Sequence, residues 1–312
     1  MEYRHLGRSG LLVSAVGVGC NNFGGRLDEA GAAAVVNAAL DLGINLFDTA
    51  DIYGNRGGSE ELLGKALKGR RRDAVIASKF AGSMGEGPLW KGGSRRYIYD
   101  AVHDSLRRLG SDYIDLYQIH FPDVETPIDE TLRALDDLVH AGDLRYIGHS
   151  NFTAAQATEA AWVAKTEHLT PFVSAQNQYN LLDRRIEGEL VGVCAKYGLG
   201  ILPYFPLSSG FLTGKHRPGQ GPAKGTRLEG PLGQRILNEG NYDTLLKLEA
   251  VADGAGRSML ELAMSWLAQQ PQVSSVIAGA MNPDQVRQNA ESIGWKLAPD
   301  ELAAIDAATK RA

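Results

Sequence analysis

An aspartate and a tyrosine stand five residues apart after a short apolar run, in the segment NLFDTADIYG at residues 45–54. A phenol can donate a proton, but its ordinary pKa of about 10 makes it a poor acid near neutral pH. A nearby ammonium group would favour the phenolate and lower that pKa. A carboxylate beside the ammonium would keep it charged and in place. Asp48 and Tyr53 can therefore form a proton-donating site only if a lysine lies beside them.

Two further apolar runs end in groups that complete this chemistry. The run VIAS is followed by Lys79, and the run IDLYQI is followed by His120. If these runs are parallel strands of one barrel, their carboxyl ends meet at one rim, so we expect both side chains near Asp48. A histidine across the pocket can hydrogen-bond to a carbonyl oxygen as negative charge develops there. The set predicts hydride delivery from a nicotinamide to a carbonyl carbon, with Tyr53 protonating the oxygen.

The elements that must position these groups alternate regularly along the chain. Strand-like runs are expected at 15–19, 44–47, 74–78, 114–119, 146–148, 172–175, 200–203 and 273–277. Helix-like segments separate them, including one capped by Asp28, one opening at Ser59 and one capped by Ser94. A hairpin over residues 3–14 precedes this pattern, and helices at 283–290 and 299–309 close it.

Eight βα units with no composition break favour one domain over residues 1–312. We predict a (β/α)8 TIM barrel with an N-terminal β-hairpin and extra C-terminal helices. An open doubly wound sheet is the alternative. The Gly- and Pro-rich stretch between Phe205 and Gly240 is too long for an ordinary connection, and it predicts a lid or binding loop, with a disordered segment as the alternative.

The overall composition excludes several classes of function. The net charge of -5 and the lack of a clustered basic face argue against a nucleic-acid partner. The only cysteines, Cys20 and Cys194, lie far apart, which excludes a disulfide framework and disfavours a metal site. The chain shows no apolar run of membrane-spanning length and no secretory leader at its start. We expect a cytoplasmic enzyme without a membrane partner, and the sequence indicates no oligomeric state.

Several motifs together resemble the aldo-keto reductase family, from the N-terminal hairpin almost to the end of the chain. They are FDTADIYG, IASK, DYIDLYQIH, GHSNF, AQNQYN, PLSSGFLTGK and NPDQVRQNA. The pattern is most similar to the bacterial branch that includes reductases like the potassium-channel β-subunits. The resemblance implies a catalytic tetrad of Asp48, Tyr53, Lys79 and His120, acting on a small carbonyl or sugar substrate.

The resemblance also implies a nicotinamide cofactor laid along the strand ends and the long loop. The nicotinamide carboxamide would be held by Ser150, Asn151 and Gln176, with Tyr204 stacked on the ring. The pyrophosphate would contact Leu207, Ser208, Gly210, Leu212 and Lys215. The adenine end would contact Gly279, Ala280, Met281, Gln285, Gln288 and Asn289.

One part of this pattern departs from the family. Members that prefer NADPH usually place a basic residue after the last strand, whereas this chain has Met281 and Gln285, with Arg287 the only base nearby. An amide lacks the guanidinium geometry that binds a phosphate in two places. We therefore expect NADP(H) as the cofactor with a weaker preference than usual, and NAD(H) as a possible one.

The sequence leaves the substrate and the direction of the reaction open. Phe23 and Trp90 are candidate substrate-binding residues, or else anchors of their loops. The expected activity is NAD(P)H-dependent reduction of an aldehyde, ketone or sugar carbonyl. The alternatives are NAD-dependent oxidation of a sugar or alcohol, and a non-catalytic cofactor-binding regulatory subunit.

Overall fold

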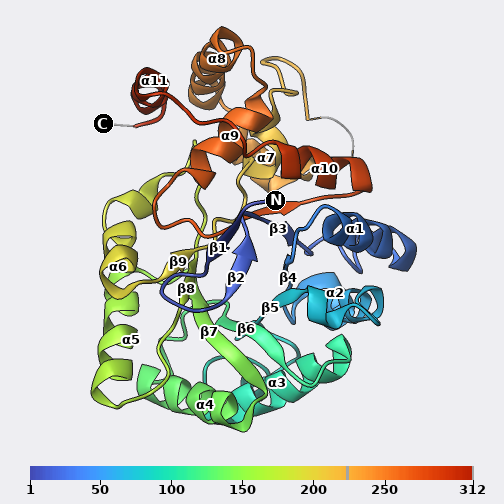
Figure 1. Cartoon of the computed structure of the whole chain (residues 1–312), viewed down its shortest axis with the longest axis vertical. Helices are drawn as coiled ribbons and strands as arrows, with labels where there is room; N and C mark the ends of the chain where they lie inside the picture. The colour runs from blue at the N-terminus through green and yellow to red at the C-terminus, as the bar shows by residue number, and fades with distance from the viewer. Residues whose placement is uncertain (223–224, 311–312) are drawn as a thin grey trace.

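The computed structural model describes residues 1–222 and 225–310 of the chain, and Figure 1 shows a central ring of strands surrounded by helices. The strands are β1 (Tyr3–His5), β2 (Leu12–Ser14), β3 (Val16–Gly19), β4 (Leu46–Asp48), β5 (Val75–Phe80), β6 (Ile114–Ile119), β7 (Leu144–Ser150), β8 (Ser174–Gln176), β9 (Gly200–Ile201) and β10 (Val276–Gly279). The α-helices are α1 (Glu29–Asp41), α2 (Tyr53–Ala66), α3 (Arg95–Leu109), α4 (Ile128–Ala141), α5 (Ala154–Thr166), α6 (Leu190–Tyr197), α7 (Pro231–Ile236), α8 (Glu239–Gly254), α9 (Met259–Ala268), α10 (Pro283–Glu291) and α11 (Pro299–Thr309). Short 3-10 helices are η1 (Arg71–Asp73), η2 (Pro88–Trp90), η3 (Arg185–Glu187), η4 (Ser208–Thr213) and η5 (Arg227–Glu229).

The eight strands from β3 to β10 form one parallel sheet that closes on itself. Their order is β10-β3-β4-β5-β6-β7-β8-β9, so each strand from β3 to β9 lies beside the next one in the chain, and the last strand, β10, lies beside the first, β3. A parallel bridge between Ile201 and Val273 joins the two outer strands, and the Ile277 amide donates to the Pro203 carbonyl at 3.1 Å. The predicted TIM barrel is therefore confirmed, and the open doubly wound sheet is excluded, because a doubly wound sheet reverses its strand order.

The antiparallel hairpin of β1 and β2 plugs the amino-terminal end of the barrel. Its Leu6 and Val13 are fully buried in a small apolar cluster with residues inside the barrel, among them Leu46 and Leu116. At the hairpin turn, Gly7 lies so close to backbone atoms before β8 and β9 that a Cβ there would lie within 2.6 Å of them. With this end filled, the opposite rim is left for chemistry.

Helix boundaries follow the predicted caps. Asp28 and Ser94 accept hydrogen bonds from Gly31 and Tyr97, as their positions predict. Element α2 spans Tyr53–Ala66, but its backbone from 54 to 57 is left-handed, with φ between 61° and 113°, so the right-handed helix begins only after Gly57, close to the predicted start at Ser59. The glycines in GNRGG permit this turn, which local helix signals do not encode.

The long Gly- and Pro-rich stretch contains local structure of its own. It holds η4, η5 and α7 before α8 begins at Glu239. Helices α8 and α11 lie outside the βα alternation and pack against each other at one end of the molecule (Figure 1). None of the helices in residues 1–222 and 225–310 combines the length and the apolar character needed to cross a membrane.

Candidate active site

Asp48, Tyr53, Lys79 and His120 meet at the carboxyl-terminal rim of the barrel. Asp48 ends β4, Lys79 lies near the end of β5, and His120 directly follows β6. Tyr53 reaches the same place because the turn after β4 leads straight into α2. The Lys79 Nζ lies 2.7 Å from Asp48 Oδ1 and 5.1 Å from the centre of the Tyr53 ring. The Tyr53 and His120 rings meet edge to face, with their centres 5.6 Å apart.

Lys79 stays protonated although its burial disfavours the charged form. Burial lowers the pKa of Lys79, but the attractions of Asp48 and Tyr53 outweigh burial and raise that pKa overall. Its ammonium also donates to the Thr49 carbonyl at 2.7 Å. A fully buried ammonium needs this many partners, because its desolvation costs several kcal/mol.

The pKa of Tyr53 differs from the sequence-based expectation. The chemistry of the motif predicted a phenol made more acidic by Lys79. Burial raises the pKa of Tyr53 above its ordinary value, and the opposing effects of Lys79 and Arg227 are smaller. The free site therefore holds a protonated phenol at neutral pH, beside an ammonium that stabilises the phenolate once the proton has left.

His120 is an uncharged imidazole in this site. Burial, reinforced by the charge of Lys79, lowers the pKa of His120 to about 2. Its ring stacks on Phe121 with centres 4.3 Å apart, and its Nδ1 is buried without a hydrogen-bond partner. A neutral imidazole can donate a hydrogen bond from its one N–H to a substrate oxygen without transferring its proton.

A chain of buried amides extends from Asp48 across the barrel. Gln176 donates to Asp48 Oδ1 at 2.9 Å, and Gln118 donates to Gln176 at 3.2 Å. Ser174 in turn donates to Gln118 at 3.0 Å. The sequence analysis missed Gln118, although its place in the motif DYIDLYQIH, inside an apolar strand, is an unusual one for an amide. This chain fixes the orientation of the Gln176 amide.

The residues expected around the nicotinamide lie on adjacent strand ends. Ser150 donates to the Gln176 carbonyl, and Asn151 donates to the His120 carbonyl at 2.9 Å. Tyr204, which follows β9, donates from its hydroxyl to Asn151 Oδ1 at 2.8 Å. The four predicted contacts, from the ends of β7, β8 and β9, therefore form one hydrogen-bonded group beside His120.

The segment after Tyr204 forms a strap, which we define as residues 205–222 and 225–230. Leu212 and Ser208 are buried in it, Leu207 and Gly210 are half-buried, and Lys215 is exposed. The Ser209 hydroxyl is buried without a partner. Gly210 has a φ of 96°, and a Cβ there would meet nothing within 4 Å. The strap thus offers a polar atom and open space where the pyrophosphate is expected.

A half-buried arginine connects the strap to the loop after β3, a link that the sequence analysis did not identify. Arg227 donates to Asn21 and Asn22, both at 2.6 Å. Burial lowers the pKa of Arg227, and no carboxylate in the described residues forms an ion pair with it. A half-buried guanidinium that forms no ion pair in the described residues is suited to an anionic ligand.

The segment after β10 has no free base in the described structure. The Met281 amide donates to Gln285, and the Asn289 amide group donates to the Gly279 carbonyl. Ala280 is buried, whereas Gln288 is exposed. Arg287 lies 2.8 Å from Asp284 and is paired with it.

The two candidate substrate-binding aromatics lie in very different surroundings. Phe23 is fully buried in the main hydrophobic core, so its ring is not accessible to a substrate in this structure. Trp90 is half-exposed and lines a cavity that none of the tetrad residues lines. The burial of Phe23 fits the alternative interpretation, in which it anchors its loop, whereas Trp90 stays a candidate for substrate binding.

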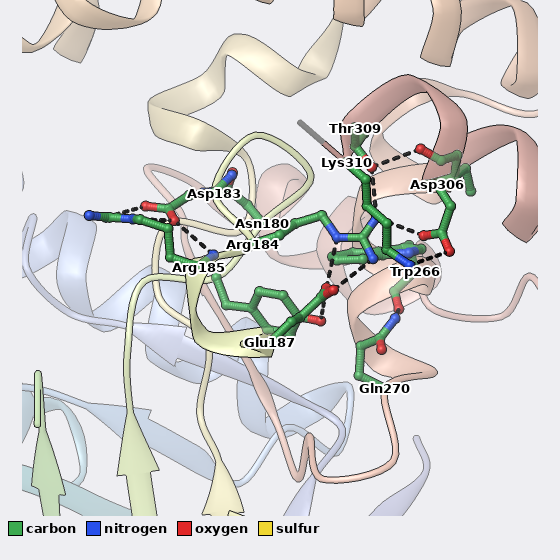
Figure 2. Close-up of polar contacts among 12 residues, drawn as sticks. Asn180, Asp183, Arg184, Arg185, Glu187, Trp266, Gln270, Asp306, Thr309 and Lys310 are labelled. Atoms are coloured by element: carbon green, nitrogen blue, oxygen red, sulfur yellow. Dashed lines mark hydrogen bonds and ion pairs between the residues drawn. The ribbon is translucent and has the colours of Figure 1, made fainter. Parts of the chain in front are cut away.

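The loop that follows Gln176 is fixed to the C-terminal helix by Arg184 (Figure 2). Arg184 makes two hydrogen bonds to Glu187 and donates to Asp306 and Thr309 of α11, all at 2.7–2.8 Å. Its guanidinium lies 4.9 Å from the centre of the buried Trp266 ring. Because the Asn180 amide from this loop donates to the Phe205 carbonyl, the clamp also supports the chain beside Tyr204.

Comparison with known proteins agrees with this geometry. The sequence profile described as "Aldo/keto reductase family" matches residues 15–310. The chain belongs to the aldo/keto reductase family. Members of this family generally use NAD(P)H as their cofactor. The protein is an oxidoreductase.

Curated aldo/keto reductase relatives align over nearly the whole chain. A "Probable voltage-gated potassium channel subunit beta" from Oryza sativa subsp. japonica is 38% identical over 302 residues, covering 94% of this chain and 91% of the relative. An "L-glyceraldehyde 3-phosphate reductase" from Escherichia coli O157:H7 is 34% identical over 319 residues, covering 98% and 92%. A "Putative voltage-gated potassium channel subunit beta" from Schizosaccharomyces pombe is 36% identical over 321 residues, covering 98% and 92%.

Proposed function

We propose that this protein reduces an aldehyde, ketone or sugar carbonyl, using NADPH and, less effectively, NADH. The observation that carries the proposal is the convergence of a phenol, an ammonium, a carboxylate and a neutral imidazole at one rim of the barrel. The Lys79–Asp48 pair at 2.7 Å and the edge-to-face contact of Tyr53 and His120 are its geometric basis.

The cofactor would be held by residues that already have room and hydrogen-bonding capacity. Ser150, Asn151, Gln176 and Tyr204 would hold the nicotinamide, and the strap with Arg227 would cover the pyrophosphate. The buried Ser209 hydroxyl and the unpaired guanidinium of Arg227 support this fit. When bound, the cofactor supplies the hydride.

Each residue of the tetrad has its own role in the transfer of the proton. Tyr53 donates its proton to the carbonyl oxygen and becomes a phenolate. Lys79 stabilises that phenolate, and Asp48 holds Lys79 charged and in place. Neutral His120 donates a hydrogen bond to the same oxygen, which orients the carbonyl and stabilises developing negative charge.

The relatives support a carbonyl substrate without defining it. The name "L-glyceraldehyde 3-phosphate reductase" describes reduction of an aldehyde by a protein that is 34% identical to this chain. The reverse reaction, oxidation of a sugar or alcohol with NAD, uses the same four residues with the proton moving to Tyr53 instead.

A second candidate function is a regulatory subunit that binds the cofactor. Relatives named as potassium channel β subunits, at 38% and 36% identity, favour this candidate. The complete tetrad favours catalysis. Affinity capture with the full chain as bait, in parallel with activity assays, separates the two: a stable partner together with no turnover of any carbonyl would replace our proposal.

The test of the proposal is the Tyr53→Phe variant, assayed with 4-nitrobenzaldehyde and NADPH. Removing the hydroxyl eliminates the proton donor, so we expect kcat to fall by about 10²–10⁴-fold, the usual contribution of a positioned acid. NADPH binding, followed by fluorescence titration, should change little. Unchanged turnover in this variant would contradict the role of Tyr53.

A further inference from the structure

Asn180, the last residue of the motif AQNQYN, is a fully buried amide outside the tetrad and outside the expected nicotinamide contacts. Its Oδ1 accepts from the backbone amides of Leu182 and Asp183, at 2.9 and 3.0 Å. Its Nδ2 donates to the Phe205 carbonyl at 2.9 Å, in the chain after β9. A carboxylate has no donor for this last bond, so the position calls for an amide, which has an acceptor at one end and a donor at the other.

The residue that Asn180 binds has a strained backbone. Phe205 has a φ of 54°, in the left-handed region that bulky residues rarely adopt. Pro206 follows it, and a residue before proline normally has an extended backbone. A conformation of this kind costs free energy and persists only where surrounding groups fix it. The Phe205 carbonyl accepts from the Ser208 amide of its own turn and from Asn180, so Asn180 fixes the strained residue from a different part of the chain.

Phe205 directly follows Tyr204, whose ring is expected to stack on the nicotinamide. A return of Phe205 to a negative φ would rotate the peptide between the two residues relative to the strap. The strap side resists this movement, because Phe211 and Leu212 are fully buried. The Tyr204 carbonyl is held less firmly, by the Tyr179 amide at 3.5 Å. We therefore expect Tyr204 to be displaced when Phe205 relaxes, while the strap stays in place.

The turn that carries Asn180 is itself fixed to the rest of the molecule. Asn180 and Asp183 exchange both of their backbone hydrogen bonds, at 3.1 and 3.0 Å. Arg184, the next residue, is clamped to Glu187 and to Asp306 of α11 (Figure 2). A positioning group needs such a rigid support, because it can be no more precisely placed than the element that carries it.

We infer that Asn180 is a positioning residue for the nicotinamide: it holds Phe205 in the left-handed conformation and thereby keeps the Tyr204 ring in place. This inference rests on the proposed function, because Tyr204 stacks on the nicotinamide only if the protein binds NAD(P)H as proposed. It adds that the stacking surface depends on the loop at residues 177–188 and, through Arg184, on α11. Because Asn180 acts through Phe205 and Tyr204, a change at Asn180 should weaken binding of the nicotinamide end of the cofactor alone.

Titration calorimetry of the full chain with two ligands tests the inference. NADPH contains the nicotinamide, whereas 2′-phospho-ADP-ribose contains the rest of the cofactor without it. In Asn180→Ala we expect the Kd for NADPH to rise by about tenfold, the size of effect expected when one aromatic contact is lost. The Kd for 2′-phospho-ADP-ribose should change by less than about twofold, because the strap remains anchored.

A change at Phe205 separates positioning from a general loss of structure. Glycine adopts the left-handed conformation without strain, so the chain in Phe205→Gly no longer needs Asn180 to hold it. In the Phe205→Gly background, Asn180→Ala should therefore weaken NADPH binding by less than about threefold. Leu182→Ala is the matched control: it removes a partly buried side chain from the same turn but leaves the bond to Phe205, and both ligands should bind as they do to the wild type.

Asn180→Asp is a second variant in case Asn180→Ala does not fold. It keeps the acceptor for the Leu182 and Asp183 amides and, once ionised, has no donor for the Phe205 carbonyl. At pH 9 it should show the same difference between the two ligands.

Three results would overturn the inference: equal weakening of both ligands in Asn180→Ala, no weakening of NADPH binding, or an undiminished loss in the Phe205→Gly background. The proposed function fails in a different way, because a wild-type chain that does not bind NADPH would contradict it directly, and this inference with it. Wild-type protein that binds NADPH and reduces 4-nitrobenzaldehyde, together with any of the three results, would contradict the inference alone.

Discussion

At the residue scale, Asp48 is the centre of the site. Its Oδ1 accepts from both Lys79 and the Gln176 amide, at 2.7 and 2.9 Å. The same carboxylate oxygen therefore connects the Lys79 ammonium to a residue expected to hold the nicotinamide. The Gln176 amide can keep its orientation only while Asp48 stays in place, so a change at Asp48 should affect cofactor binding as well as proton transfer.

The preference for NADPH over NADH also depends on single residues. Met281 lies in the segment after β10, where we expect the 2′-phosphate of NADPH, and Arg287 in the same segment is paired with Asp284 at 2.8 Å. Met281→Arg would place a free guanidinium beside the expected 2′-phosphate. We expect the ratio of kcat/KM for NADPH over NADH to rise by about tenfold, as a charge-assisted hydrogen bond contributes about 1.5–3 kcal/mol.

The matched control for this prediction is Met281→Gln, which adds a polar group of similar length without charge. Its cofactor ratio should stay close to that of the wild type. If Met281→Arg leaves the ratio unchanged, position 281 does not face the 2′-phosphate.

At the scale of elements, two arginines link the strap to the loop after β3: Arg26 donates to the Gly225 carbonyl of the strap, and Arg227 donates from the strap to that loop. Arg227 at the start of η5 donates to Asn21 and Asn22, in the loop after β3. These residues are more than 200 positions apart in the chain, and the hydrogen bonds hold the strap against the barrel rim. Removing the Arg227 link should therefore loosen the strap, and the Arg26 link would remain.

Replacing Arg227 with Met keeps much of the bulk and removes the donors. We expect NADPH to dissociate about tenfold faster from Arg227→Met, measured by stopped-flow fluorescence during displacement with excess NADP⁺. The loss corresponds to about 1.4 kcal/mol, typical of a hydrogen bond involving a charged group. Arg235→Met, an exposed arginine in the neighbouring α7, should leave the release rate unchanged. Equal rates in both variants would show that the strap is not fastened by Arg227.

At the scale of the whole molecule, stability carries a pH dependence from a buried histidine outside the site. His149 in β7 is fully buried between Phe152 and Phe172, and neither ring nitrogen has a hydrogen-bond partner. Burial lowers the pKa of His149 to about 3. The unfolded chain therefore binds a proton at this residue before the folded chain does.

The sign of the effect follows from that difference. The stabilising contribution of neutral His149 is complete above pH 6.5 and is lost as the pH falls from about 6.5 toward 3. Between pH 6.5 and 5, His149 alone should lower the free energy of unfolding by about 2 kcal/mol. His120, with its pKa lowered to about 2, should contribute in the same direction.

Urea unfolding at pH 7 and pH 5 measures this effect. His149→Leu removes the titrating group and should lose about half of the decrease in stability that the wild type shows. His103→Leu replaces an exposed histidine and should leave the decrease unchanged. A decrease of the same size in His149→Leu would assign the acid sensitivity to other groups.

The sequence by itself determined the barrel, because the alternation of apolar runs and amphipathic helices is a local pattern repeated eight times. It also predicted which four groups meet, since parallel strands deliver their carboxyl ends to one rim whatever their exact lengths. Strand ends were less well predicted: β7 runs from Leu144 to Ser150, beyond the expected 146–148, because pairing with β6 extends it.

Only the tertiary structure decided what depends on burial or on contacts between distant parts of the chain. The pKa of Tyr53 is raised because the phenol is deeply buried, and the sequence motif does not determine the depth of burial. The link from Arg227 to Asn21, the clamp of Arg184 on α11 and the hydrogen bond from Asn180 to Phe205 join segments that no local pattern relates. The sequence thus specified which groups meet at the rim. Tertiary packing determined their protonation states and the segments that surround them.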